Sequence, residues 1–471
     1  MDSARELLGV EYLFPYQRLV VANTLDAYQA AMEGENDAAE LSKQIVVLPT
    51  GSGKTLCFLL PAAMLPGLTI VVYPLLALME DQRRRAEEAE IPARILRGGM
   101  PDRARRQLFH DIHNGDVKIL ITNPEMLAVA EVLRHLREVR VSHFVIDEAH
   151  CVSEWGLSFR PSYLELAAAI EGLAPIVTSA FTATASDLVL RQVATSLFGD
   201  APVRLVRGNP DRPNISYAVV PVHSKELAME SLLVGQNAIE RPAIVFCRSR
   251  IRTESYARKL SRLMPYRCVA AYHAGLDREE REEIEGWFFE ADDAVLIATC
   301  AYGMGVDKKN VRSVIHVDVP PSVEAFLQES GRAGRDGAPA SSVFLCSPSD
   351  IRSSDARKDI MLGYLTEAGC RRSYLMNAMG SDSDACFGCD ACTPDTIPAR
   401  DTQVFTNDAR ACAQILQIVE RHPRRFTVSH LIPTLPWTKN RCEELINALL
   451  VTDRLRVLRK GPWKGTLSKS R

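Results

Sequence analysis

Four cysteines between residues 370 and 392 have a spacing that suits a single metal ion. Fifteen residues separate Cys370 from Cys386, and Cys389 and Cys392 each follow after two intervening residues. Thiolates in paired CxxC spacing can close on one tetrahedral Zn²⁺. Three of these cysteines fall within seven polar, turn-like residues that offer no apolar face. A zinc site is therefore favoured over reduced core cysteines.

Residues 48–55 (LPTGSGKT) have the composition of a phosphate-binding loop, although Leu48 stands where the general pattern has glycine. They follow an apolar run and lead into the apolar stretch KTLCFLLPAAML, which suits a strand and a helix. Glycines let backbone N–H groups approach phosphate oxygens, a lysine supplies positive charge, and a hydroxyl can bind Mg²⁺. The predicted nucleotide-binding residues are Thr50, Gly51, Ser52, Gly53, Lys54 and Thr55, and Thr55 is also assigned to Mg²⁺.

An acidic pair, Asp147 and Glu148, ends another apolar run in the sequence VIDEAH. Ligands of open α/β sheets bind at the carboxyl ends of the strands. There, Asp147 would orient Mg²⁺ and Glu148 would polarise the attacking water, because phosphoryl transfer depends on positioning and charge neutralisation. The alternative, a cap on a surface helix, is less suited to a position at a strand end.

Residues 328–337 (QESGRAGRDG) carry two arginines three positions apart. On one helical face, Arg332 and Arg335 can reach a γ-phosphate as arginine fingers, with Arg335 as the first choice. Structural salt bridges are the alternative. The predicted catalytic set is Lys54, Asp147, Glu148, Gln328, Arg332 and Arg335.

The segment that follows the acidic pair, CVSEWGLSFRPSY, interleaves Trp155, Phe159 and Tyr163 with Arg160. This pattern fits a platform on which bases stack beside a cation that contacts phosphate. Burial of the aromatic rings in a core is the alternative, but the turn-like WGLS stretch is a poor core segment. Trp155, Phe159 and Arg160 are the predicted DNA-binding residues.

Two successive α/β halves would position these groups. Short apolar runs alternate with amphipathic stretches, which predicts two doubly wound parallel sheets joined near residues 207–214. The expected strands are 44–49, 69–74, 118–123, 144–149 and 175–184 in the first half, and 243–247, 268–273, 294–299, 313–318 and 342–346 in the second.

Residues 402–460 fit a small winged helix. Thr406 or Asn407 would cap its first helix and Thr438 its second. Each helix has an apolar face, formed by Cys412, Ile415, Leu416 and Val419 in the first and by Cys442, Leu445, Ile446 and Leu449 in the second. The segment DRLRVLRKGPWKG then predicts a strand and a short basic wing. Trp463 would either wedge at a duplex junction or cover the module's core.

The chain of 471 residues, with 56 Lys and Arg against 59 Asp and Glu, allows about three globular domains. No targeting signal or bilayer-spanning run is evident, so we expect a cytoplasmic protein without membrane contact. The eight other cysteines are scattered, which suits reduced thiols in that compartment.

Residues 401–471 carry a net charge of +7. This excess favours contact with duplex DNA or phosphate, and a merely solvated face is the alternative.

These motifs resemble the RecQ family of ATP-dependent DNA helicases over residues 12 to about 395. Further matching stretches, in the family's order, are VVYPLLALMEDQ, TNPEML, FTATA, NPDRPN, IVFCRSR, YHAGL and ATCAYGMGVDKKNVRSVIH. The zinc segment also begins, as in that family, with a cysteine followed by two arginines. The resemblance implies ATP, Mg²⁺ and Zn²⁺ as cofactors, single-stranded and duplex DNA as partners, and 3′–5′ translocation.

By the same resemblance, Gln17 would read the adenine edge, and Thr182 and Thr184 would link hydrolysis to domain movement. The aromatic-rich loop would couple single-stranded DNA to ATP hydrolysis. For His273 and Tyr302 a packed core role is an equal alternative. The residues that would line the cleft or the DNA path in the second half are Tyr272, His273, Met304 and Gly305.

Three features depart from the family. Phe14 stands where the family usually has arginine, and Leu157 and Ser158 stand where it has histidine and then aspartate. The loss of these polar groups beside the DNA loop leaves the strength of ATP–DNA coupling open. A helical accessory domain that many members carry is not expected here.

The sequence therefore predicts an α/β protein with two tandem RecA-like P-loop lobes at residues 1–207 and 208–350. A zinc-binding helical module at 351–400 and a winged-helix-like DNA-binding module at 401–471 would follow. The expected activity is that of an ATP-dependent DNA helicase. One alternative is a DNA-stimulated ATPase or translocase within a larger assembly, without robust unwinding; another is an ATP-switched DNA-binding scaffold. Protein partners and the pathway, whether DNA repair, DNA recombination or phage defence, stay open.

Overall fold

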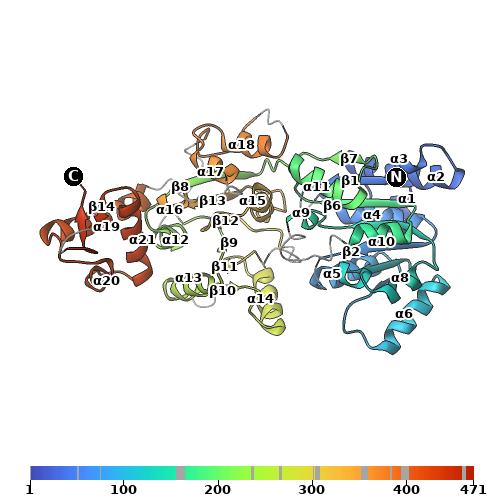
Figure 1. The fold of residues 1–471 in the computed structure, drawn as a ribbon, viewed down its shortest axis with the longest axis horizontal. Helices are drawn as coiled ribbons and strands as arrows, with labels where there is room; N and C mark the ends of the chain where they lie inside the picture. Colours follow the sequence, from blue (N-terminus) through green and yellow to red (C-terminus); the bar gives the residue numbers. More distant parts are fainter. Residues whose placement is uncertain are drawn as a thin grey trace. The chain divides into compact units, whose positions relative to one another are not determined.

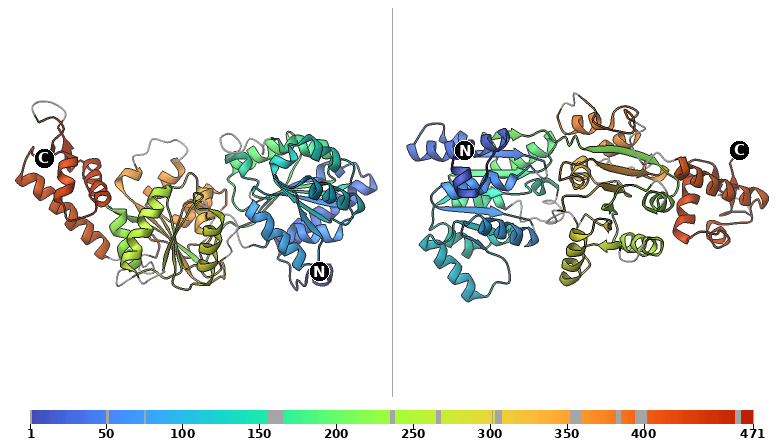
Figure 2. Two further views of the ribbon diagram at one scale, coloured as in Figure 1. Left: turned by 90° about the horizontal axis from the view of Figure 1, so that it is seen from below. Right: turned by 180° about the vertical axis from the view of Figure 1, so that it is seen from behind.

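The structure, a computed structural model, describes most of the chain. The described residues are 2–49, 52–74, 76–154, 165–234, 238–264, 268–300, 302, 308–351, 359–381, 385–393, 402–458 and 463–470. They form two compact units, Met1–Asp211 with Met379–Ser381, and Arg212–Ala378 with Asp382–Arg471. Each unit is built around one parallel sheet flanked by helices (Figures 1 and 2). The two tandem α/β lobes predicted from the sequence are confirmed.

The sheet of the first unit has seven strands in the order β3-β4-β2-β5-β6-β1-β7, and every neighbouring pair is parallel. The inner strands β2, β5 and β6 are buried at every position, as expected of parallel strands covered on both faces. The strands are β1 (Lys43–Val47), β2 (Leu68–Val72), β3 (Ala93–Ile95), β4 (Ile119–Thr122), β5 (Val141–Ile146), β6 (Val177–Thr182) and β7 (Arg204–Arg207).

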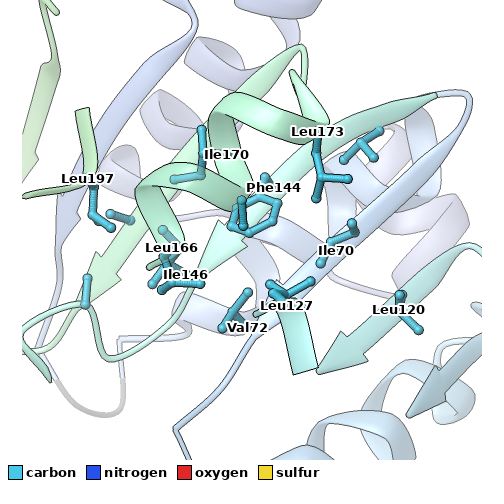
Figure 3. Close-up of a cluster of buried hydrophobic side chains, with 14 of the residues drawn as sticks. Ile70, Val72, Leu120, Leu127, Phe144, Ile146, Leu166, Ile170, Leu173 and Leu197 are labelled. Carbon is cyan, nitrogen blue, oxygen red and sulfur yellow. The ribbon is translucent and has the colours of Figure 1, made fainter. Parts of the chain in front are cut away.

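Helices cover both faces of this sheet. Side chains alternate between the faces of a strand, so Phe144 and Ile146 pack on one side and Val145 on the other. Figure 3 shows Phe144 and Ile146 beside residues of α10, among them Ile170. The helices are α1 (Asp2–Leu8), α2 (Pro15–Glu33), α3 (Ala38–Leu41), α4 (Lys54–Met64), α5 (Leu76–Glu88), α6 (Asp102–Asn114), α7 (Pro124–Leu127), α8 (Ala130–Leu136), α9 (Cys151–Glu154), α10 (Leu166–Leu173) and α11 (Asp187–Phe198).

The second unit has a six-stranded parallel sheet in the order β10-β11-β9-β12-β13-β8. Its strands are β8 (Ile215–Pro221), β9 (Ala243–Phe246), β10 (Val269–Tyr272), β11 (Val295–Ala298), β12 (Ser313–His316) and β13 (Ala340–Cys346). The helices that accompany the sheet are α12 (Lys225–Val234), α13 (Arg250–Leu263), α14 (Arg278–Glu290), α15 (Val323–Ser330) and α16 (Pro348–Ile351). Helices α17 (Asp359–Thr366) and α18 (Arg371–Ala378) lead to the cysteine segment.

The C-terminal module consists of α19 (Thr402–Arg421), α20 (Val428–Leu431), the 3₁₀ turn η5 (Ile432–Thr434), α21 (Lys439–Val451), and the antiparallel strands β14 (Leu455–Val457) and β15 (Leu467–Lys469). Both predicted apolar faces lie in its core. The predicted cap at Thr438 is confirmed, because its hydroxyl accepts the Arg441 N–H at 3.4 Å. The predicted cap at Thr406 or Asn407 is wrong. Helix α19 already begins at Thr402, and nothing in the intervening sequence QVF stops a helix.

In the two lobes, three strands, β3, β7 and β8, were not predicted from the sequence. All three lie at sheet edges, where a strand has a neighbour on one side only. In β3 and β7 buried and solvent-facing residues are mixed over three or four positions, so these strands give no continuous apolar run. Of the helices in the described part of the chain, none combines the length and the apolar composition that a bilayer crossing requires.

Candidate nucleotide, arginine and metal sites

The loop between β1 and α4 has the geometry of a phosphate-binding loop. Gly53 precedes α4 with φ of 76°, a conformation that favours glycine. A Cβ at this position would lie 2.5 Å from Gln17 Nε2. Lys54 and Thr55 open α4, where backbone N–H groups attract anions. Of the remaining predicted members of the loop, Ser52 is described, and Thr50 and Gly51 lie outside the described residues.

Gln17, in the first turn of α2, is tied to this loop. Its side chain is only 3% exposed. Its Oε1 accepts the Phe14 N–H at 2.9 Å, and its Nε2 donates to Ser52 O at 2.9 Å. Tyr16 Oη donates to the same carbonyl at 3.2 Å. The Gln17 amide therefore stabilises the loop in this structure, and its role in reading adenine stays a prediction.

The acidic pair lies at the carboxyl end of β5, beside the loop. Asp147 Oδ1 accepts the Glu148 N–H at 2.9 Å, and Glu148 has φ of 51°, a strained conformation for a residue with a Cβ. Burial and the charge of Glu148 raise the pKa of Asp147 to about 7, and Lys54 acts in the opposite direction. A cation beside Asp147 would favour its ionised form. The donor set thus fits Mg²⁺ at Thr55 and Asp147.

A series of buried polar groups connects this pair to β6. Glu148 Oε2 lies 3.4 Å from His150 Nδ1 without a hydrogen bond between them, and His150 Nδ1 lies within hydrogen-bond distance of Thr182 Oγ1, at 3.1 Å. Thr182 Oγ1 donates to Thr184 O at 3.0 Å. The side chain expected to act on water is therefore linked to the segment expected to transmit hydrolysis. His150 received no role from sequence reasoning, although the last letter of VIDEAH marks it.

The predicted DNA-binding residues Trp155, Phe159 and Arg160 lie outside the described residues. The same holds for the two departures at Leu157 and Ser158. It also holds for Met304 and Gly305 in the second lobe. Their roles stay predictions.

The arginine segment of the second lobe is not a continuation of α15. That helix, whose last turn contains Gln328, ends at Ser330. Arg332 and Arg335 follow in a run of turns, so the prediction that they share a helical face is wrong. Gly334 takes φ of 56°, which ends any helical course. Arg332 is 5% exposed, and its guanidinium carbon lies 6.0 Å from the centre of the Tyr302 ring.

Two residues that sequence reasoning did not assign hold this segment in shape. Arg212 donates to Gly331 O at 3.2 Å and to Gly334 O at 2.7 Å. Asn214 Nδ2 donates to Gly334 O and to Ala338 O, both at 2.8 Å. A Cβ on Gly334 would meet Asn214 Nδ2 at 2.4 Å. Both residues lie in the NPDRPN stretch. This stretch contributed to the family resemblance but did not predict a contact with the arginine segment.

Three other residues singled out in the second lobe are packed. Tyr302 is buried, with its ring centre 5.1 Å from that of Tyr272. His273 is also buried, and its Nε2 lies 3.1 Å from Glu254 Oε1. This placement agrees with the core role that was the alternative for His273 and Tyr302.

The structure brings together the four cysteines of the predicted zinc site. Their Sγ atoms all lie within 4.8 Å of one another. A Zn–S bond of about 2.3 Å sets tetrahedral sulfur atoms about 3.8 Å apart, so small shifts complete the site. Ser373 N–H donates to Cys370 Sγ and Cys392 N–H to Cys389 Sγ, both at 3.4 Å. Burial acts to raise the pKa of Cys370, but the hydrogen bonds from Ser373 and the neighbouring thiols lower it to about 7. These four thiols could hold Zn²⁺.

The two arginines after Cys370 anchor this module to β8. Arg371 Nε donates to Asp390 Oδ1 at 3.1 Å, and Asp390 Oδ2 accepts the Val219 N–H at 3.2 Å. Arg372 is completely buried, donates to the carbonyls of Arg212 and Ile215, and lies over the Tyr217 ring. The Cys-Arg-Arg sequence thus joins a metal ligand to two anchors on the lobe.

Comparison with known proteins matches both lobes and most of the chain. The profile described as DEAD/DEAH box helicase matches residues 15–192, and the helicase conserved C-terminal domain matches residues 224–337. The ATP-dependent DNA helicase RecQ of Pasteurella multocida is 32% identical over 443 residues, which cover 90% of this chain and 68% of that protein. The RecQ protein of Bacillus subtilis is 30% identical over 438 residues, 88% of this chain and 72% of that protein. The chain therefore spans about two thirds of the length of these relatives.

Solved structures share the fold at low sequence identity. The DEAD-box helicase Mss116, bound to single-stranded RNA and UDP-BeF, matches with a TM-score of 0.58 and 16% identity, over 93% of this chain and 86% of that chain. The helicase Lhr of Mycobacterium smegmatis, bound to single-stranded DNA and AMP-PNP, matches with a TM-score of 0.53 and 22% identity. This match covers 97% of this chain and 60% of that chain. These matches support the two-lobe architecture.

Proposed function

The chain belongs to the RecQ family of ATP-dependent DNA helicases, and from this premise we propose that it couples ATP hydrolysis to 3′–5′ translocation on single-stranded DNA and to duplex unwinding. ATP binds at the loop between β1 and α4. Lys54 Nζ donates to Leu48 O at 3.1 Å at the base of this loop, and its positive charge would pair with a phosphate oxygen. Gln17 contacts the base with its amide.

The acidic pair performs the chemistry on water. Glu148 orients the attacking water and accepts its proton, because hydrolysis depends mainly on positioning and charge neutralisation. Thr55 and Asp147 would hold Mg²⁺, which would supply positive charge beside the phosphates. Arg332 and Arg335, with Gln328, stabilise the charge that develops during transfer.

The observation that carries the coupling proposal is the polar series from Glu148 through His150 and Thr182 to Thr184. A change at Glu148 during hydrolysis alters the His150 contact and, through Thr182, the end of β6. Trp155, Phe159 and Arg160 bind single-stranded DNA just beyond α9, which follows the same acidic pair. Nucleotide state and DNA contact are thereby connected through one short stretch of chain.

The remaining two modules, at the four cysteines and at the C-terminus, bind zinc and DNA. We propose the division into residues 1–207, 208–350, 351–400 and 401–471, with one Zn²⁺ at the four cysteines and duplex DNA at the C-terminal module. The net charge of +7 over residues 401–471 supports the duplex contact. The eight cysteines outside the proposed zinc site, none of them in a disulfide, support a cytoplasmic location.

A translocase without robust unwinding is the second candidate. The departures at Leu157 and Ser158 favour it, because they remove a polar pair beside the DNA loop. Strand displacement and ATP turnover measured on one preparation, with duplexes carrying either a 3′ or a 5′ single-stranded tail, separate the candidates. The helicase proposal predicts ATP-dependent displacement from the 3′ tail only. DNA-stimulated turnover without displacement would favour the translocase, and ATP-dependent DNA binding without turnover would favour a scaffold.

A further inference from the structure

The C-terminal module, residues 402–470 as described, is docked on the second lobe through polar groups. In the described part of the chain, the apolar cores of the lobe and of the module form separate clusters. Helix α21 of the module contacts α12 of the lobe (Figure 1). Beside this contact lies a cavity of about 240 Å³ lined by charged and polar side chains of both parts, including Lys225, Arg252 and Asn440. Polar contacts to α12 therefore contribute to holding the module in place, beside the contact of α12 with α19.

Glu444 of α21 reaches the start of α12. Its Oε2 accepts the Ser224 hydroxyl at 2.9 Å and the Glu226 N–H at 3.3 Å. Backbone N–H groups in the first turn of a helix lack partners within the helix, and negative charge is favourable there. Glu444 Oε1 accepts a hydrogen bond from the Tyr256 hydroxyl at 3.3 Å and lies 3.6 Å from an Arg252 nitrogen. A carboxylate of the module thus caps a helix of the lobe.

Glu226 of α12 makes the reverse contact. It is only 2% exposed, and its Oε1 accepts the Thr438 hydroxyl at 2.7 Å. Thr438 is the residue that caps α21. Glu226 Oε2 accepts Asn440 Nδ2 at 3.3 Å and pairs with Lys259 of the lobe. Each of the two glutamates therefore contacts the first turn of the other's helix.

We propose that Glu226 and Glu444 form a reciprocal latch that fixes the C-terminal module to the second lobe. Resting on the helicase function proposed above, the latch makes the module move with this lobe during the ATPase cycle and keeps bound duplex in register with it. The two glutamates are positioning residues, because they act on DNA only through the module that they hold.

The first test measures the distance between a label on the lobe and a label on the module in the full chain. Exposed positions on α14 and α19, Glu290 and Gln417, accept labelled non-canonical amino acids, which avoid the twelve native cysteines. The unaltered latch predicts one narrow distance distribution. Glu444→Ala should broaden it, and Glu226→Ala with Glu444→Ala should abolish the single peak, because loss of one member of a buried charged network leaves the others uncompensated.

A matched control and a second variant separate release of the module from misfolding. Glu420→Ala should keep the narrow peak, because Glu420 is exposed and pairs with Lys469 within the module at 2.9 Å. Tyr256→Phe removes a donor to Glu444 without changing the module. It should broaden the peak in the wild-type background and add nothing to Glu444→Ala. A single narrow peak in the double glutamate variant would overturn the latch.

The functional readout is the number of base pairs unwound per ATP hydrolysed. Glu444→Ala should lower this ratio while DNA-stimulated ATP turnover persists, and an unchanged ratio in a protein with a broadened distance distribution would contradict the coupling role. The distance measurement needs neither ATP nor DNA. A docked module in a protein that does not unwind DNA would therefore refute the helicase proposal and leave the latch standing.

Discussion

His150 Nδ1 and Thr182 Oγ1 lie 3.1 Å apart, and this contact between two buried side chains joins the end of β5 to the end of β6. His150 also lies 3.4 Å from Glu148, and Thr182 donates to Thr184 O. The pair thus lies between Glu148, the carboxylate proposed to act on water, and the segment that follows β6.

Removal of the Thr182 hydroxyl should weaken this connection without unfolding the lobe. Thr182→Val keeps the shape of the side chain but takes a hydrogen-bond partner from His150 and from Thr184 O. We expect DNA-stimulated ATP turnover to fall by ~10-fold, the effect of about one hydrogen bond. Thr178→Val, at another buried threonine of β6, is the matched control. Equal turnover in both variants would show that the polar groups from Glu148 to Thr184 do not couple DNA binding to ATP hydrolysis.

The cysteine site should hold one Zn²⁺ per chain. Because thiolate binding energy in so small a module is also folding energy, Cys389→Ser should abolish zinc binding and expose the segment around α18 to protease. Cys300→Ser, at an exposed thiol elsewhere, should keep the metal. Metal analysis of protein purified without chelator provides the measurement. Absence of zinc from the wild-type protein would refute the site.

Stability of the first lobe should fall in acid because of His143. This side chain in β5 is fully buried, its Nε2 lies 2.8 Å from Ser179 Oγ, and burial lowers its pKa to about 3. The unfolded chain binds a proton at a pKa of about 6.5, so the stabilisation present above that pH is lost as pH falls towards 3, at up to ~1.4 kcal/mol per pH unit.

Urea denaturation between about pH 7 and pH 5 tests this effect. The free energy of unfolding of wild type should decline more steeply than that of His143→Gln, which carries no titrating ring. The absolute stability of the variant is irrelevant, because only the slopes are compared. Parallel slopes would mean that His143 has the same pKa in the folded and unfolded states, and would refute the effect of burial on it.

The aromatic loop should govern coupling to DNA. Trp155→Ala should lower DNA-stimulated turnover far more than basal turnover, because loss of a stacking platform costs ~1–3 kcal/mol per base only when DNA is bound. Leu157→His with Ser158→Asp restores the family's polar pair and should raise the stimulation by single-stranded DNA. A fall in stimulation with folding intact would mean that the loop is rebuilt around Leu157, and would favour the translocase.

Local patterns in the sequence were sufficient for the features that depend on neighbours along the chain. The buried run before Asp147 predicted a parallel strand. The topology then placed this residue with Lys54 at the carboxyl ends of the strands. The clustering of the four cysteines was also predictable, because a tetrahedral zinc site requires thiols at such spacing along the chain. In the C-terminal module, both apolar faces followed from helical periodicity.

Features that depend on distant partners could not be predicted in this way. Arg332 and Arg335 have helical spacing, but Arg212 and Asn214, more than a hundred residues earlier, hold their segment in a series of turns. The contact between Glu226 and the first turn of α21 joins residues 212 positions apart. No local spacing encodes either pairing, because each arises only when separate elements pack together.

The central claim is that Glu148 drives ATP hydrolysis that DNA stimulates. The most direct measurement is ATP turnover of purified Glu148→Gln and wild type, each with and without single-stranded DNA. Wild type should be stimulated by DNA, and Glu148→Gln should lose at least ~10²-fold of this turnover, because it removes the group that positions water in the transition state. Turnover near that of wild type in a folded, ATP-binding Glu148→Gln protein would contradict the account.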